Sequence, residues 1–142
     1  TEGRAKGERR DEPRAGHDCL LPLVGRVLGD ADLDVSWGAG STPELLGPWI
    51  ELARSRGVAL AGPMALIDDH VPFVEAGVAR VLSLIDFRYG GRTAPGWRWH
   101  TRGDGLDGVS AQSLNAFGGL LVEWLARVEP QIARSRGAID DR

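Results

Sequence analysis

Hydrophobic positions gather in short runs that predict two buried strands in the middle of the chain. Leu20 to Leu28 is an apolar run that ends at Gly29-Asp30, a pattern typical of a short buried strand. Val78 to Ile85 is mostly apolar and partly β-branched, which indicates a strand covered on both faces.

Two further segments repeat apolar residues at helical spacing, which predicts amphipathic helices. The first helix is expected to begin at Thr42-Pro43-Glu44, where a hydroxyl can cap it, proline suits its first position and an acid favours its dipole. Gly57 can close this helix, and Ser110 is expected to cap the second one. The buried face of the first helix is predicted to hold Leu45, Leu46, Trp49, Ile50 and Ala53, and that of the second Leu114, Phe117, Leu121, Trp124, Leu125 and Val128.

Helices that alternate with strands buried on both faces indicate an α/β layer architecture. Between the second strand and the last helix lies a long irregular stretch, Asp86–Val109. Loops of that length in compact domains are often functional, so this stretch is a candidate for the site.

The two ends of the chain are polar. Residues 1–18 carry ten charged side chains, five of each sign, without a large apolar residue, so they are predicted to form a disordered arm. Residues 130–142 are expected to be a polar tail that frays. The folded part is therefore predicted to span residues 19–129.

Composition removes several classes of partner and site. The 142 residues carry a net charge of -3, so no basic footprint for nucleic acid is present. A single cysteine, Cys19, excludes an internal disulfide framework and a multi-cysteine zinc site. No apolar run is long enough to span a bilayer, and the residues that follow Thr1 are not expected to form a signal peptide, because they lack a charged and then apolar leader pattern. We therefore expect neither a nucleic-acid nor a membrane partner.

A first candidate cluster is Asp68-Asp69-His70, directly before Val71-Pro72. Two carboxylates beside an imidazole can orient a base, hold a proton or support a metal ligand. The alternative interpretation is structural: Asp68 or Asp69 caps a short helix that begins at Val71, and the other side chains are surface.

A second candidate cluster is the segment Trp97–Thr101, which Asp104 and Asp107 follow. Aromatic rings around His100 can form a partly dry pocket wall, in which an imidazole binds a metal or transfers a proton. The alternative is a histidine that simply packs between tryptophans. Both clusters flank the same predicted strand, as ligand sites do in open α/β sheets.

Three strings in this order resemble the C-terminal half of metallopeptidase family twenty-eight, which contains zinc aminopeptidases and glutaminyl-peptide cyclotransferases. They are Ile67–Val78 (IDDHVPFVEAGV), Leu84–Phe87 (LIDF) and Trp99–Thr101 (WHT). The resemblance covers roughly residues 24–128 and includes, in register after the last string, Asp104, Leu106, Asp107, Val109 and Ser110. It implies a partial mixed β-sheet flanked by helices, the C-terminal half of a three-layer α/β domain of the zinc aminopeptidase kind.

The resemblance also implies roles for individual residues. His100 matches the histidine that is the family's last zinc ligand, and Trp99 matches a tryptophan that lines the substrate pocket. Asp68 and Asp69 match an acidic pair at the active site, where Asp68 is the better candidate for a hydrogen-bonded acid network. His70 is implied to support the same pocket.

The chain departs from the family at its other zinc ligands. Family members draw these from an N-terminal half with a His-x-Asp motif, a bridging aspartate and a Glu-Glu pair, none of which is found here. Arg26 stands where the family has an acid, and a cation there would repel zinc. Zinc is thus implied for the full-length family, but one imidazole does not hold it, and the isolated chain is predicted to be inactive.

The leading hypothesis is a fragment of a zinc-dependent metallo-exopeptidase, which hydrolyses the bond next to a peptide N-terminus through a zinc-activated water. The alternatives are a glutaminyl-peptide cyclotransferase-like enzyme, or a non-catalytic remnant acting as an interaction module. A partial sheet would expose an unpaired edge and could self-associate through it. Many relatives are secreted or periplasmic, but the chain itself leaves the localisation open.

Overall fold

The computed structural model describes residues 20–24 and 31–140 and contains one four-stranded mixed sheet. The spatial order of the strands is β1-β4-β2-β3, with β1 at Leu20–Val24, β2 at Asp34–Gly38, β3 at Ala59–Met64 and β4 at Arg80–Ile85. β1 runs parallel to β4 and β2 parallel to β3, whereas β2 and β4 are antiparallel.

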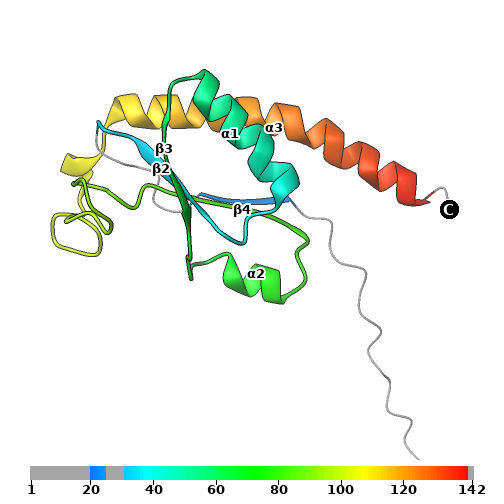
Figure 1. Ribbon diagram of the computed structural model, residues 1–142, viewed down its shortest axis with the longest axis horizontal. Coiled ribbons are helices and arrows are strands. Elements are labelled where there is room, and N and C mark those ends of the chain that lie inside the picture. The colour runs from blue at the N-terminus through cyan, green and yellow to red at the C-terminus, as the bar shows by residue number, and fades with distance from the viewer. Residues whose placement is uncertain (1–19, 25–30, 141–142) are drawn as a thin grey trace, which may run out of the picture.

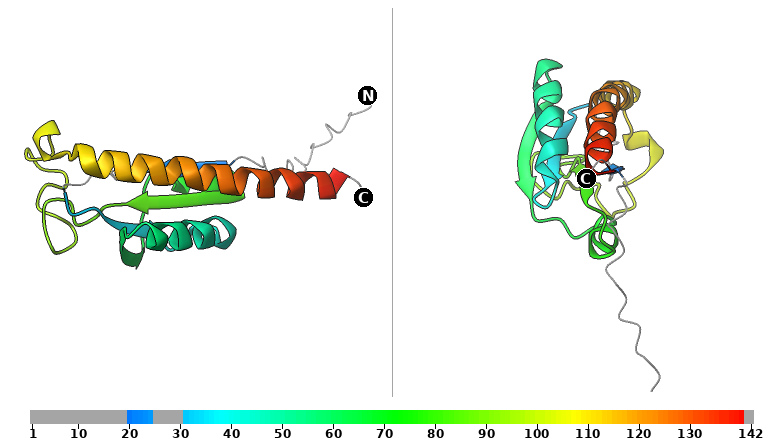
Figure 2. Two further views of the ribbon diagram at one scale, coloured as in Figure 1. Left: turned by 90° about the horizontal axis from the view of Figure 1, so that it is seen from above. Right: turned by 90° about the vertical axis from the view of Figure 1, so that its right-hand side faces the viewer.

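Three helices flank this sheet, as the α/β prediction requires. They are α1 at Pro43–Ser55, α2 at Val71–Glu75 and α3 at Ala111–Asp140, and a short 3-10 helix spans Leu106–Gly108. Figures 1 and 2 show α1 and α3 side by side above the strands, while α2 lies below them. The predicted fold class, a partial mixed sheet flanked by helices, is confirmed.

The core lies between the sheet and the pair α1 and α3. Trp49 of α1 packs against Phe117 and Trp124 of α3, with ring centroids 5.3 Å and 6.2 Å apart. The indole N–H of Trp124 donates a hydrogen bond of 3.0 Å to the carbonyl oxygen of Leu45. The core cluster is formed by Val35, Leu45, Trp49, Leu52, Ala53, Leu82, Leu84, Phe117, Leu120, Trp124 and Val128.

β4 is buried on both of its faces, as its sequence predicts. Leu82 and Leu84 join the core under α1 and α3. Val81, Ser83 and Ile85, which alternate with them, are also buried. Because β4 lies between β1 and β2, its backbone is paired on both sides, and an apolar run is the composition that such a strand needs.

The start of α1 differs from the prediction. Thr42 occupies the N-cap position, but its hydroxyl makes no cap hydrogen bond. Thr42 Oγ1 instead accepts a hydrogen bond from the backbone N–H of Val81 at 2.9 Å, and Ser41 Oγ accepts one from that of Ser83 at 3.2 Å. These hydroxyls satisfy backbone donors of β4 beyond the end of β2, so tertiary pairing replaces local capping.

The other predicted helix signals are present. The backbone N–H of Gly57 donates to Arg54 and that of Val58 to Ala53, and Gly57 has φ of +70°, a conformation that closes helices. Ser110 Oγ accepts from the N–H of Ser113 at 3.2 Å and caps α3.

Two strands, β2 and β3, were not predicted from the sequence. Both are short, and β3 contains glycine and proline, residues that normally argue against a strand. β3 tolerates them because it is one of the two edge strands among the four that are described.

Some predictions about the chain ends lie outside the described residues, namely the disordered arm at 1–18 and the substitution at Arg26. Within the predicted polar tail, α3 continues as a helix as far as Asp140. Pro130 removes only one backbone donor from α3, and Ile132 packs against the core, which carries the helix past it.

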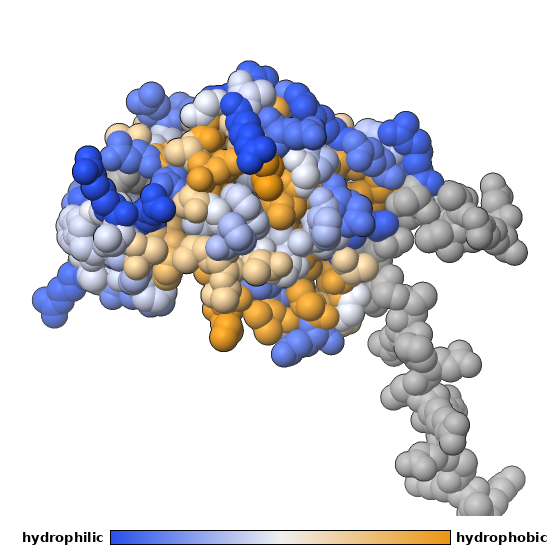
Figure 3. All heavy atoms as spheres, in the orientation of Figure 1, coloured by the Kyte–Doolittle hydropathy of each residue, from blue (hydrophilic) through white to orange (hydrophobic). Residues whose placement is uncertain are grey.

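The surface carries one apolar feature near α2. Ile67 is 95% exposed, and Phe73 and Val74 are 41% and 48% exposed. Figure 3 shows apolar residues gathered along the lower side of the molecule, where Figure 1 places α2. None of the helices in the described part of the chain has the length and apolar composition needed to cross a bilayer.

Candidate functional site

The pairing of β2 with β4 brings polar side chains together at one end of the sheet. Ser36 of β2 lies opposite Ile85 of β4 in an antiparallel register. The first residue of β2, Asp34, therefore lies near Asp86, the residue that follows β4. This end of β4 also begins the 86–109 loop, which carries the second candidate cluster.

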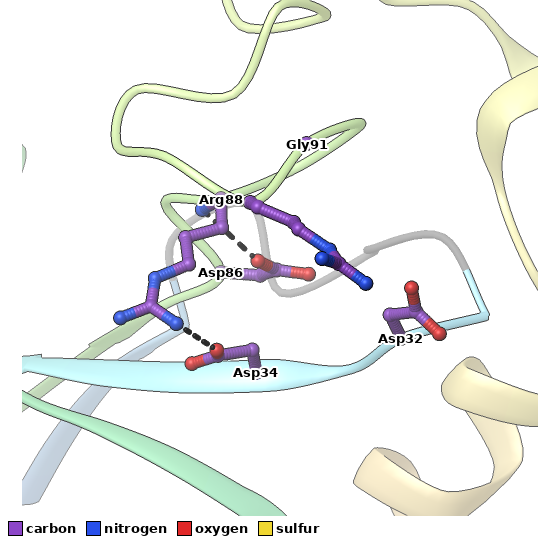
Figure 4. A pocket seen from close by; sticks show the side chains of 6 residues that line it. Asp32, Asp34, Asp86, Arg88 and Gly91 are labelled. Carbon is purple, nitrogen blue, oxygen red and sulfur yellow. Dashed lines mark hydrogen bonds and ion pairs between the residues drawn. The ribbon is translucent and has the colours of Figure 1, made fainter.

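A pocket of about 420 Å³ opens at this end of the sheet (Figure 4). Arg88 Nη1 contacts Asp34 Oδ2 at 2.9 Å, which joins the loop to the start of β2. The carboxylate of Asp86 is buried, and its Oδ1 accepts a hydrogen bond of 3.2 Å from the N–H of Arg88. The lining is formed by Asp32, Asp34, Asp86, Arg88, Gly91 and Arg92. Three carboxylates and two guanidinium groups suit a polar ligand that carries both donors and acceptors.

Three rings contact one another in a row that begins at Phe87, the residue between the pocket residues Asp86 and Arg88. The ring of Phe87 meets that of Trp99 edge to face, with centroids 5.3 Å apart. Trp99 in turn stacks on the imidazole of His100 at 4.0 Å, with the two planes 10° apart. His100 is exposed and has φ of +55°, a left-handed conformation that is uncommon for residues other than glycine. Strained backbone of this kind is often found at functional sites.

The first candidate cluster, Asp68-Asp69-His70, has a different environment. Asp68 and Asp69 are exposed, whereas His70 is 7% exposed and occupies the N-cap position of α2. Asp68 Oδ1 accepts from the N–H of Asp69, and neither carboxylate caps α2. The capping part of the structural alternative is therefore wrong, because neither aspartate stands at the N-cap position, whereas the exposure of both agrees with the surface placement in that alternative.

The fold keeps the two candidate clusters apart. Asp68 and Asp69 follow the carboxyl end of β3, which runs parallel to β2 and therefore opposite to β4. They lie near the start of β4, whereas the loop with Trp99 and His100 follows its end. Figure 1 shows the loop at the left of the molecule and α2 below the strands. The sequence expectation that both clusters flank one strand is right, but they flank it at opposite ends.

The described residues do not fit a zinc site. In the part of the chain that the structure describes, no three His, Cys, Asp or Glu side chains are arranged to hold a metal ion. A catalytic zinc needs about three protein ligands, and His100 offers one exposed imidazole.

Sequence reasoning missed the pocket residues Asp34 and Arg88. Asp34 opens a strand that was not predicted, so nothing placed it near the end of β4. A signal for Asp86 was available, because it directly follows the predicted buried strand, where ligands gather in α/β sheets.

Comparison with known proteins gives one informative match. No protein family model matches the chain, and no curated protein matches it. Among solved structures, the chain is similar to a glutaminyl cyclase. That crystal structure, of an enzyme from an Acidobacteriales bacterium, shares 36% sequence identity with the chain at a TM-score of 0.66. The match covers 78% of this chain and 39% of the cyclase, so the chain spans about two fifths of that protein's length.

This similarity confirms the predicted fold, which corresponds to part of a glutaminyl cyclase-like domain. It supports the cyclotransferase alternative of the sequence analysis more than the leading exopeptidase hypothesis.

Proposed function

We propose that this chain contributes the loop end of a substrate site of the glutaminyl cyclase kind, which receives a peptide with an N-terminal glutamine. The observation that carries the proposal is the 36% identity to a glutaminyl cyclase over 78% of the chain. The cyclisation joins the α-amino nitrogen to the side-chain amide carbon of that glutamine and releases ammonia.

Residues at the end of β4 suit parts of this task. The indole of Trp99 offers an apolar wall against which the glutamine side chain can pack. His100 is exposed at the same place, and an imidazole can donate or accept a proton near neutral pH. The carboxylates and guanidinium groups of the pocket beside Phe87 offer partners for the peptide backbone.

Asp68 and Asp69 belong to the proposal as the acidic pair that the resemblance implies. Because they lie at the opposite end of β4, the proposal assigns contact with the glutamine to Trp99 and His100. An Asp68→Asn variant separates the two ends: it is expected to leave peptide binding by the chain unchanged.

The test is a binding experiment on the full 142-residue chain. A short peptide with N-terminal glutamine is titrated while NMR signals of the Trp99 indole and His100 imidazole are followed. The same peptide with N-terminal glutamate serves as the matched control. We expect both signals to shift with the glutamine peptide and to shift much less with the glutamate peptide. Unchanged signals with the glutamine peptide would contradict the proposal.

Product analysis separates the proposed activity from the exopeptidase hypothesis. The chain is incubated with a glutamine-leading peptide and with an amino-acid anilide, and its zinc content is measured after purification. Because no complete metal site is present among the described residues, we expect little turnover of either substrate and no tightly held zinc. About one zinc per chain that is lost in His100→Ala would show that a metal site is complete. Anilide hydrolysis without cyclisation would favour the exopeptidase.

A further inference from the structure

We propose that Arg98 is a positioning residue, which holds the 86–109 loop in the form that stacks Trp99 on His100. The use of this pair for substrate rests on the proposed function, whereas the positioning itself rests only on the contacts of Arg98.

The side chain of Arg98 contacts both limbs of the loop. Its guanidinium carbon lies 4.7 Å from the ring centroid of Trp97 and 6.0 Å from that of Tyr89. Nη1 donates a hydrogen bond of 2.7 Å to the carbonyl oxygen of Gly103 and lies 3.6 Å from Asp107 Oδ2. One side chain thus connects the start of the loop to its end.

Arg98 is itself mostly shielded from solvent, although its partners Trp97 and Asp107 are exposed. The side chain of Arg98 is 18% exposed, and a cation held over an aromatic face interacts more strongly when water is excluded. Gly108, at the end of the 3-10 helix, packs directly on it: a Cβ atom built there would meet the guanidinium of Arg98 and the hydroxyl of Tyr89. The loop is therefore assembled around this guanidinium.

The backbone connects Arg98 to the stacked pair. The N–H of Trp99 donates to Gly96, and the N–H and hydroxyl of Thr101 both donate to the carbonyl oxygen of Arg98. These turns bracket His100, whose left-handed backbone conformation needs support from its neighbours. Holding the side chain of Arg98 thus fixes the backbone on both sides of the stack.

Lysine cannot replace arginine in this role. A guanidinium is planar, so it can lie on the Trp97 ring while its edge donates to Gly103, whereas an ammonium is a compact point charge. Arg102, an exposed arginine of the same loop, provides a matched control for the loss of charge.

The experiment compares R98A, R98K and R102A with the parent chain by NMR at one pH. The chain has three histidines, so the His100 imidazole signals can be assigned from their disappearance in His100→Gln. Stacking on an indole shifts imidazole protons upfield. We expect the upfield shift of the His100 protons in the parent and in R102A. In R98A the shift should be lost, and in R98K most of it should be lost. The helical circular dichroism signal should be retained in all of these proteins.

Two outcomes would overturn the inference. An unchanged His100 shift in R98A would show that the stack forms without Arg98. Global unfolding of R98A would make Arg98 a residue of the core fold rather than of the loop. Peptide binding is read separately: if the parent chain shows the stack but binds no glutamine peptide, the positioning role stands and the proposed function fails.

Discussion

The indole of Trp99 stacks on the imidazole of His100, with ring centroids 4.0 Å apart and planes 10° from parallel. The two residues are neighbours in the chain, and neighbouring side chains face each other in this way only when the backbone turns sharply between them. The left-handed conformation of His100 supplies that turn. The pair is also joined to the sheet, because Phe87, two residues past the end of β4, meets the Trp99 ring edge to face.

The contact between Phe87 and Trp99 is expected to stabilise the loop by about 0.5–1.5 kcal/mol beyond the area it buries. A double-mutant cycle with Phe87→Leu and Trp99→Leu, followed by urea unfolding, measures this coupling directly. Additive effects of the two substitutions would show that the rings do not interact.

Gly96 is a position at which no larger residue fits. A Cβ atom there would overlap the carbonyl oxygen of Tyr89, while a Cβ at Gly91 finds only ordinary contacts of 3.8 Å or more. Gly96→Ala is therefore expected to displace the loop and change the fluorescence of its tryptophans, and Gly91→Ala to change it little. Equal spectra for the two variants would contradict the close approach.

The ion pair between Asp34 and Arg88 connects β2 to the loop. Since the side chain of Arg88 is 42% exposed, solvent screens the pair, and Asp34→Ala is expected to cost about 1 kcal/mol or less. Asp69→Ala removes an exposed aspartate near α2 and is expected to cost nothing measurable. The difference in thermal midpoint between the two variants measures the pair, and it should shrink in the background of Arg88→Gln.

Glu123 of α3 responds to pH through its arginine partners. A hydrogen bond from Arg127 at 2.6 Å, together with the charge of Arg56 at the end of α1, lowers the pKa of its carboxyl. Its stabilising contribution is complete above the pKa of the unfolded chain, about 4.3, and is lost as pH falls through the lower folded value. The thermal midpoint of the parent chain should fall between pH 5 and 3, and that of Glu123→Gln should fall slightly less. High salt should reduce this difference between the variant and the parent chain.

Trp124 is one of the two fully buried tryptophans of the core among the described residues. It is fully buried, contacts Trp49 and donates to Leu45, so Trp124→Ala is expected to cost about 3–5 kcal/mol and to unfold much of the population. Val122, on the same helix, is 68% exposed, and Val122→Ala should cost far less. Denaturant unfolding of the two variants checks both expectations.

The elements that could be predicted from the sequence are those that a local pattern of residues defines. The apolar run of β4, the helical spacing in α1 and α3, the closing role of Gly57 and the Ser110 cap are all local, and each was predicted. β2 and β3 lack such a pattern. In β3 a glycine and a proline interrupt the sequence, and it is a strand because its backbone pairs with β2, not because of its composition.

The candidate site divides in the same way. The sequence by itself determined which residue types stand after β4, and the resemblance drew attention to Trp99 and His100. Only the tertiary structure decided that Asp34 meets Arg88 and that Thr42 serves β4 instead of its own helix. It also decided that β3, which Asp68 and Asp69 follow, runs opposite to β4, which the loop with His100 follows. The physical reason is strand direction. β2 and β4 are antiparallel, and whether two strands pair parallel or antiparallel depends here on contacts between segments about 50 residues apart along the chain.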